Sequence, residues 1–281
     1  MTDTANKTDR TDRTEFHGKA EAYAQARPGY PAEAMAYIGT LIGGSSVPDA
    51  ASATEGLPVP AAAPDASPVT VADIGAGTGK FTVPLAALGH PVFAVEPDAD
   101  MRAALRGAVA DLPNVTVVDG NAERTGLPDG SVDVVTCAQS LHWFRHDAFL
   151  AECARIARCD RGRCGDRGGR GDRRILLVSI YNRTSFDSGM RHWDGGPALA
   201  GSVDHVRRTT TEYFRHPAVR EFANPIRYTL DSWRAFMDSH SHSPLPDSPD
   251  YPAHRAWVDR IFAQRAVDDN VCVVTGEVLT F

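Results

Sequence analysis

The feature that most constrains this chain is the stretch VADIGAGTGKF, which begins at Val71. Its β-forming residues lead into Asp73, and glycines follow at positions 75, 77 and 79, just before Lys80. A strand, a glycine-rich turn and a helix in this order are typical of an open α/β sheet, where the turn and the helix N-terminus form a ligand site at the carboxyl end of the strand. The stretch therefore predicts a binding loop at the edge of a parallel sheet.

The segments after this loop repeat the alternation of strand and helix. We expect strands in VTVADIG, PVFAVEP, VTVVDG, VDVVTCA and RRILLVSIY, later strands in EFANPIRYTL and VCVVTGEVLTF, and amphipathic helices in SWRAFMDSHS and HRAWVDRIFAQRA. Helices are expected between the early strands over 80–88, 99–109 and 147–157. Strands joined by helices require βαβ crossovers. The sequence thus predicts the α/β class, with a doubly wound seven-stranded, mostly parallel sheet.

The chain has 281 residues, enough for one large α/β domain. Residues 1–14 are polar and lack an apolar period, so we expect a disordered tail followed by a single domain over 15–281. Residues 43–68 and 155–174 have low-complexity compositions that cannot form a core, and we expect two flexible insertions there.

Helices are also expected before the sheet and over its edge. One begins near Phe16 and is broken by ARPGYP, because proline and glycine cannot continue it, and a second covers 32–42. Residues 182–220 are polar and are expected to form a helical lid region over the sheet edge.

Composition excludes several classes of protein. The net charge of −7 argues against a nucleic-acid binder, and no apolar run is long enough to cross a membrane. The N-terminus lacks the apolar core of a secretory signal, so we expect a cytoplasmic protein. We also expect it to be a monomer or a homodimer. The spacing of Cys153, Cys159 and Cys164 is irregular, so no metal site is expected.

The glycine loop partly resembles two phosphate-binding sequence motifs, but it matches neither of them. The dinucleotide motif G-x-G-x-x-G, counted from Gly75, needs a glycine where Lys80 stands. The P-loop G-x-x-x-x-G-K-[ST] needs a hydroxyl residue after the lysine, where Phe81 stands. The loop is therefore built for another ligand.

The pattern D-x-G-x-G-x-G from Asp73 to Gly79 resembles motif I of the class I S-adenosylmethionine-dependent methyltransferases, of the methyltransferase type 11 kind. The resemblance continues in Glu96 and Pro97 at the end of the second strand, and in DGNAERTGLPDG, where Asn121 stands at a position that relatives usually fill with Asp. AQSLHWF and AEAYAQARPGYP are similar to the small-molecule branch that includes trans-aconitate methyltransferase.

This resemblance implies a Rossmann-like methyltransferase fold with helical lid elements, which binds S-adenosyl-L-methionine and methylates an oxygen or carboxylate of a small molecule. It implies a carboxylate at Glu96 that accepts the ribose hydroxyls, an amide oxygen at Asn121 that accepts from the adenine amino group, and an Asp73 that orients the methionine part near its ammonium. The residues implied to bind the cofactor are Asp73, Gly75, Ala76, Gly77, Gly79, Glu96, Pro97, Asn121, Ala122, Gln139 and Ser140.

The candidates for acceptor chemistry are fewer. His142 is the candidate general base, although a packed histidine beside Trp143 is the alternative, because a carboxylate acceptor needs no base. Trp143 is expected to line a pocket or fill the core. Tyr23, Arg27 and Tyr30 form a candidate lid over cofactor and acceptor, or else an exposed helix end.

Two other functions remain open at this point. One is a nicotinamide-dependent oxidoreductase, which the lysine at position 80 disfavours. The other is a non-catalytic cofactor-binding module that acts through the arginine-rich segment 155–174.

Overall fold

The computed structural model describes most of the sheet and its helices. The described residues are 26–43, 68–158, 173–183, 202–240, 243–264, 267–268 and 270–281. The expected tail over 1–14, almost all of the helix expected near Phe16, and most of 43–68 and 155–174 lie outside these residues.

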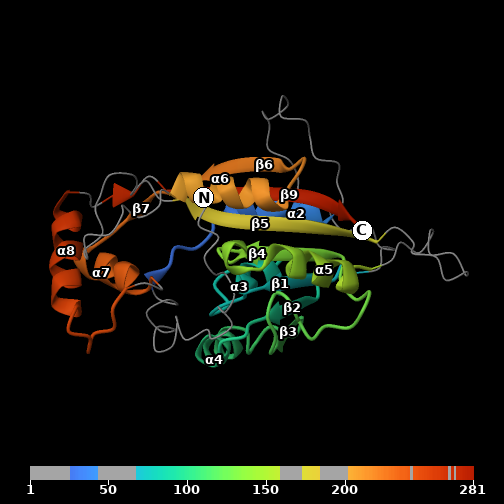
Figure 1. The fold of residues 1–281 in the computed structure, drawn as a ribbon, viewed down its shortest axis with the longest axis horizontal. Coiled ribbons are helices and arrows are strands. Elements are labelled where there is room, and N and C mark those ends of the chain that lie inside the picture. The colour runs from blue at the N-terminus through green and yellow to red at the C-terminus, as the bar shows by residue number, and fades with distance from the viewer. Residues whose placement is uncertain are drawn as a thin grey trace, which may run out of the picture.

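A seven-stranded sheet forms the centre of the protein, in the order β3-β2-β1-β4-β5-β9-β6 (Figure 1). The strands are β1 Val71–Ile74, β2 Val92–Val95, β3 Val115–Val118, β4 Val134–Ala138, β5 Arg174–Arg183, β6 Ala218–Ala223 and β9 Val271–Thr280. The first five are parallel, and β9 lies antiparallel between β5 and β6. The expected doubly wound, mostly parallel sheet is confirmed.

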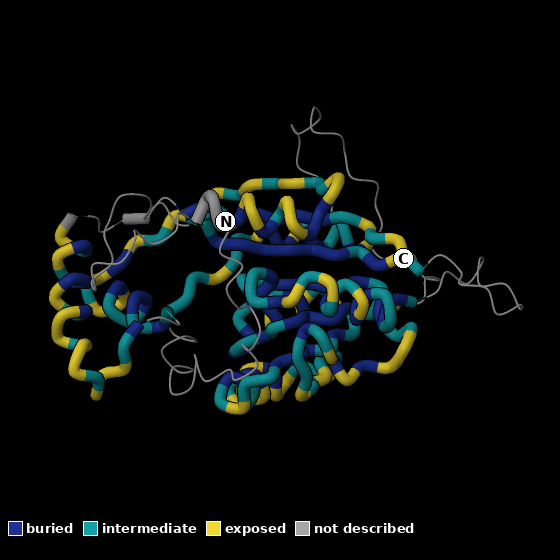
Figure 2. The backbone as a smooth tube through the Cα atoms, viewed as in Figure 1, coloured by how far each residue is buried: buried dark blue, intermediate teal, exposed yellow. Residues whose placement is uncertain are grey.

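Helices cover both faces of this sheet, which explains why β1 and β4 at its centre are buried along almost their whole length. The helices are α2 Ala32–Ile42, α3 Thr82–Ala86, α4 Ala99–Ala108, α5 His146–Ile156 and α6 Ser202–Tyr213. Val71 faces the core under α2 and α3, whereas its neighbour Ala72 faces the core under α5 and α6. Figure 2 shows β5 as a long buried strand across the middle of the sheet. The carboxyl ends of β1, β2, β3, β4 and β5 therefore meet at one edge of the sheet. We call it the ligand edge, because open α/β sheets bind their ligands there.

The last third of the chain departs from the sequence-based expectation in one strand. EFANPIRYTL was expected as a single strand, but β6 ends at Ala223, and β7 (Ile226–Arg227) pairs with β8 (Val267–Asp268) in a separate two-stranded sheet. The break falls at Asn224 and Pro225. Proline has no backbone N–H to donate to a ladder, so the strand cannot continue through it.

Two helices near the C-terminus form a cap with its own apolar core, at one end of the molecule in Figure 1. They are α7 (Leu230–Asp238) and α8 (Tyr251–Gln264). Trp233 is 1% exposed, and its indole N–H donates to the Val258 carbonyl at 2.9 Å, which ties α7 to α8. Phe236 and Trp257 complete the same cluster. We call α7 and α8 the cap.

The lid was expected within 182–220, but the described part of that range belongs to the sheet and to the helices that cover it. It holds the end of β5, helix α6 and the start of β6. Val206 and Tyr213 of α6 are buried in the core of the sheet, so α6 belongs to the covering layer. The helix that lies over the ligand edge is α7, as described below.

The arginine-rich segment begins and ends in ordered structure, so its boundaries are corrected. Arg155 belongs to α5, and its Nε donates to Glu152 at 2.8 Å. Arg158 donates to the Thr70 hydroxyl at 3.0 Å, and Arg173 to the Arg155 carbonyl at 2.9 Å. These contacts hold the two ends of the segment against α5 and the residue before β1.

Candidate functional site

The glycine loop after β1 has a backbone that only glycine adopts easily. Gly75, Gly77 and Gly79 have φ angles of 74°, 59° and 87°. A Cβ on Gly75 would lie 2.7 Å from the Cβ of Ser140, and one on Gly79 would lie 2.9 Å from Leu105 Cδ1. Their spacing therefore lets the loop rest directly on the end of β4 and on α4.

Asp73 lies beneath this loop and is completely buried. Its carboxylate accepts hydrogen bonds from the Thr82 hydroxyl at 2.7 Å and the Thr136 hydroxyl at 3.2 Å. Burial raises the pKa of Asp73 to about 6, against the opposing effect of both hydroxyls. The side chain thus joins β1 to α3 and β4, and its expected role in orienting the cofactor stays a prediction.

Glu96 connects the end of β2 to the glycine loop. One carboxylate oxygen accepts from the Gly77 N–H at 2.8 Å, and the other accepts from the Asp98 N–H at 2.9 Å. Only 7% of Glu96 is exposed. Two elements separated in the sequence, the loop and the second strand, therefore meet at this carboxylate.

Arg102 was not among the residues expected from the sequence. Its guanidinium donates to the carbonyls of Glu96 and Pro97, both at 2.9 Å, and to Asp119 at 2.9 Å. It thereby ties the end of β2 to the end of β3. The sequence did offer one signal for Arg102. It stands in the helix that follows the second strand, one turn after the capping residue Asp98.

Asn121 forms the turn that follows β3. Its side-chain oxygen accepts from the N–H of Glu123 at 3.1 Å and of Arg124 at 2.8 Å. The amide oxygen expected to face adenine is thus already an acceptor within the turn, and a purine contact from this side chain would use its NH₂ group. Ala122 is 1% exposed and packs into the core.

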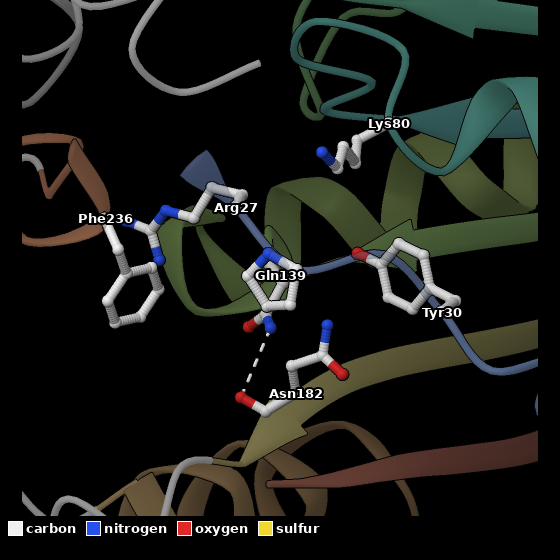
Figure 3. A pocket seen from close by; sticks show the side chains of 7 residues that line it. Arg27, Tyr30, Lys80, Gln139, Asn182 and Phe236 are labelled. Atoms are coloured by element: carbon white, nitrogen blue, oxygen red, sulfur yellow. Dashed lines mark hydrogen bonds between the residues drawn. The ribbon is translucent and has the colours of Figure 1, made fainter. Parts of the chain in front are cut away.

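A pocket opens at the same edge of the sheet (Figure 3). It is lined by Arg27, Pro28, Tyr30, Lys80, Gln139, Asn182 and Phe236. The Lys80 amine and the Tyr30 hydroxyl point into the space between them and Arg27 (Figure 3). Burial lowers the pKa of Lys80. The pocket thus places two basic side chains beside hydroxyl and amide groups.

Sequence reasoning named three of the lining residues and missed others. It named Arg27, Tyr30 and Gln139, and it missed the roles of Asn182 and Phe236. Asn182 follows the long apolar run of the fifth strand, and a polar residue at the carboxyl end of a strand was an available signal. Phe236 comes from α7, and its approach to the pocket depends on tertiary structure.

Residues 72–160 match the family model described as a methyltransferase domain. An uncharacterized methyltransferase of Mycobacterium tuberculosis is 36% identical over 143 residues, covering 51% of this chain and 47% of that protein. A second protein of this organism, named a probable S-adenosylmethionine-dependent methyltransferase, is 33% identical over 128 residues, covering 45% of this chain and 41% of that protein. These matches support a class I S-adenosylmethionine-dependent methyltransferase domain over residues 72–160.

The chain spans about half the length of the curated relatives it matches. Among solved structures, the YcgJ protein of Bacillus subtilis is 18% identical, covers 74% of this chain and 91% of its own, and has a TM-score of 0.45. The family match favours methyl transfer over the nicotinamide-dependent oxidoreductase that the sequence left open. Whether the arginine-rich segment serves a partner lies outside the described residues.

Ser140 and His142 follow Gln139 after β4, and Ser140 lies against Gly75 of the glycine loop. The Ser140 hydroxyl donates to the Ile74 carbonyl at 2.8 Å, beneath Gly75. His142 Nδ1 lies 3.1 Å from the Tyr181 hydroxyl, and its backbone N–H donates to the same oxygen at 3.2 Å. Neither His142 nor Trp143 is among the described residues that line the pocket. The role of His142 as a base stays a prediction.

Two more residues expected at the site from the sequence were Trp143 and Tyr23. Trp143 packs against the sheet core and lies 4.9 Å from the His142 ring, centroid to centroid. This position agrees with the core alternative, and a place for Trp143 in a pocket wall stays a prediction. Tyr23 lies outside the described residues.

The loop of the methyltransferase domain fits the cofactor that the family uses. The Thr78 side chain, in the middle of the loop, is 4% exposed, and its hydroxyl has no hydrogen-bond partner among the described residues. A buried hydroxyl of this kind usually has a partner, and a polar ligand on the loop would supply one. The left-handed glycines around it leave the backbone open to close approach.

Within the described ranges, no group of three or more His, Cys, Asp or Glu side chains is arranged to hold a metal ion. Of the helices that the structure describes, none has the length and apolar character needed to cross a membrane.

Proposed function

We propose that this chain transfers a methyl group from S-adenosylmethionine to a carboxylate or other oxygen of a small molecule. The observation that carries the proposal is the 2.8 Å hydrogen bond between the Gly77 N–H and Glu96. It joins the loop that would receive the methionine part to the carboxylate that would accept the ribose hydroxyls. Asn121 and Ala122 follow at the next strand, on the side where the adenine would lie.

The cofactor supplies a methyl group that is already activated on sulfur. The protein then has to hold the acceptor in line with that methyl and keep water away. Arg27 and Lys80 line the pocket and offer positive charge to an anionic acceptor. Phe236 closes the cap side of the pocket with an apolar ring.

This arrangement favours a carboxylate acceptor. Two basic side chains line the pocket, and a carboxylate needs no general base before it attacks. His142 would serve as a base only for a neutral hydroxyl, and it would have to reach the acceptor from its place beside Tyr181.

Calorimetric titration with S-adenosylhomocysteine tests the cofactor half of the proposal. We expect the wild type to bind, Glu96→Ala to bind at least about 10-fold more weakly through loss of a charged hydrogen-bond acceptor, and Asp147→Ala, an exposed carboxylate outside the loop, to bind as the wild type does. No binding by the wild type at millimolar ligand would overturn the proposal.

The acceptor half needs a transfer assay. The purified protein is incubated with methyl-labelled S-adenosylmethionine and two matched panels, small carboxylic acids and the corresponding alcohols. We expect base-labile labelled product from the acids. Label on the alcohols alone would remove the carboxylate preference and leave methyl transfer standing.

A further inference from the structure

The short segment 27–30, which we call the strap, crosses the ligand edge of the sheet between α7 and α2 (Figure 1). At its start, the Arg27 guanidinium lies 5.5 Å from the centre of the Phe236 ring and donates to the Ser239 carbonyl at 3.4 Å. At its end, the Tyr30 ring meets the Phe81 ring edge to face at 5.1 Å. The strap thus touches both the cap and the helix start after the glycine loop.

The middle of the strap is held by amide side chains. The Gly29 carbonyl accepts from Asn182 Nδ2 at 3.2 Å and from Asn224 Nδ2 at 3.0 Å. Asn224 Nδ2 also donates to Asn182 Oδ1 at 3.0 Å. A Cβ at Gly29 would have no described atom within 4 Å, so side-chain packing does not fix this residue. Hydrogen bonds to its carbonyl hold the backbone here.

A third amide joins this group from β4. Gln139 Nε2 donates to the Asn182 carbonyl at 3.3 Å, the contact drawn in Figure 3. Gln139 has a φ of 57°, a left-handed conformation that is uncommon for residues other than glycine. The end of β4, the end of β5 and the residue after β6 therefore meet beneath the strap.

We propose that Asn182 and Asn224 are positioning residues, an amide latch that holds the strap so that Arg27 and Tyr30 face the pocket. The inference rests on the proposed function, because the pocket is where that function would bind its ligands. Asn224 is not among the described residues that line the pocket. Its effect on ligand binding would therefore pass through Gly29 and the strap.

The chemistry of the latch predicts an order of substitutions at Asn224. Alanine removes one donor from the Gly29 carbonyl. Aspartate keeps the shape but places acceptor oxygens against that carbonyl and against Asn182 Oδ1, so it replaces attraction with repulsion. Asn224→Asp should therefore release the strap more than Asn224→Ala does.

Hydrogen exchange of the peptide that covers the strap measures this release directly. We expect exchange in that peptide to speed up about 5-fold in Asn224→Ala, the effect of one lost hydrogen bond, and further in Asn224→Asp. Asn114→Ala is the matched control, because its amide also holds two carbonyls, those of Ala86 at 2.9 Å and His90 at 2.8 Å, away from the pocket. Unchanged strap exchange in both Asn224 variants would overturn the latch.

Titration with S-adenosylhomocysteine then tests whether the latch acts through the strap. We expect Asn224→Ala to weaken binding about 5-fold and Asn114→Ala to leave it unchanged. In a background that carries both Arg27→Ala and Tyr30→Phe, the effect of Asn224→Ala should fall below about 2-fold, because the guanidinium and the hydroxyl that the latch positions are gone. An equal loss in both backgrounds would overturn a positioning role.

The two proposals fail in different ways. If the wild type does not bind S-adenosylhomocysteine, the proposed function fails. The exchange rates of the strap in the wild type, Asn224→Ala and Asn224→Asp still show whether the latch holds it. If the wild type binds and the strap exchanges alike in all variants, the latch fails and the proposed function stands.

Discussion

At the scale of single residues, the site depends on buried polar groups whose partners come from neighbouring strands. Asp73 is the clearest case, because its carboxyl is completely buried and accepts from Thr82 and Thr136. Burial favours the neutral form of the carboxyl and raises its pKa to about 6. An acid in this position makes stability depend on pH.

Asp73→Asn tests that dependence. A carboxyl whose pKa is raised in the folded state stabilises the fold below its ordinary pKa of 3.8, and this contribution is lost as pH rises through about 6. Between pH 4 and pH 7 the wild type should lose about 2 kcal/mol of unfolding free energy relative to the variant. Urea unfolding of both proteins across this range measures the difference. Curves that stay parallel would contradict the raised pKa.

Gly75→Ala separates the two demands on the glycine loop. The variant carries the cost of a left-handed alanine, about 1–2 kcal/mol, and the overlap of its Cβ with Ser140 at 2.7 Å, about 1–3 kcal/mol more. Gly89→Ala is the control, since Gly89 has a φ of 87° but nothing described within 4 Å of a Cβ. Urea unfolding should rank Gly75→Ala as the more destabilised. Equal losses would mean that the approach of Ser140 does not matter.

At the scale of elements, the ligand edge is formed by residues that follow the carboxyl ends of the parallel strands. The loop after β1, Glu96 after β2, Asn121 after β3 and Gln139 after β4 all follow parallel strands, so the topology brings them to one edge. The cap adds α7, whose start is a capping box between Thr229 and Ser232. That box sets where the helix carrying Phe236 begins.

Thr229→Ala should loosen α7 locally. The hydroxyl accepts from the Ser232 N–H at 3.1 Å, and loss of an N-cap costs about 1 kcal/mol. Hydrogen exchange within α7 should speed up accordingly. Thr211→Ala is the control, because the Thr211 hydroxyl bonds carbonyls of α6 without capping its start, and exchange there should change little. Unchanged exchange in α7 would show that the box does not hold the helix.

At the scale of the whole molecule, the sheet and the cap have separate apolar cores. The sheet core contains Leu177, which is fully buried, and the cap core is built around Trp233. The strap and the chain through β7 connect the two (Figure 1). Two cores with a narrow connection are expected to open with different free energies.

Matched variants in each core test this division. Trp233→Phe removes the 2.9 Å hydrogen bond to the Val258 carbonyl and should raise exchange in α7 and α8 by an amount equivalent to about 1–3 kcal/mol, with little change in β1 and β4. Leu177→Ala should lower the free energy of global unfolding by about 2–5 kcal/mol. If Trp233→Phe raised exchange equally in the cap and the central strands, the molecule would be a single cooperative unit.

Local patterns were enough to predict much of this molecule. The strand–loop–helix order, the helix over 32–42 and the last strand of the sheet follow from hydrophobic periodicity and from breakers such as the ARPGYP stretch, which act within a few residues. Local patterns failed at EFANPIRYTL, where the apolar spacing continued but Pro225 ended the ladder.

The sequence by itself determined the identity of the binding loop, because the positive φ angles after β1 need glycine and the spacing of those glycines excludes both phosphate motifs. Only the tertiary structure decided what stands over that loop. Gly29 and Asn224 are 195 positions apart, and Arg27 meets Phe236 across a similar distance along the chain. Contacts of this kind leave no local periodicity, since they arise from where packed elements end and not from the order of neighbouring residues.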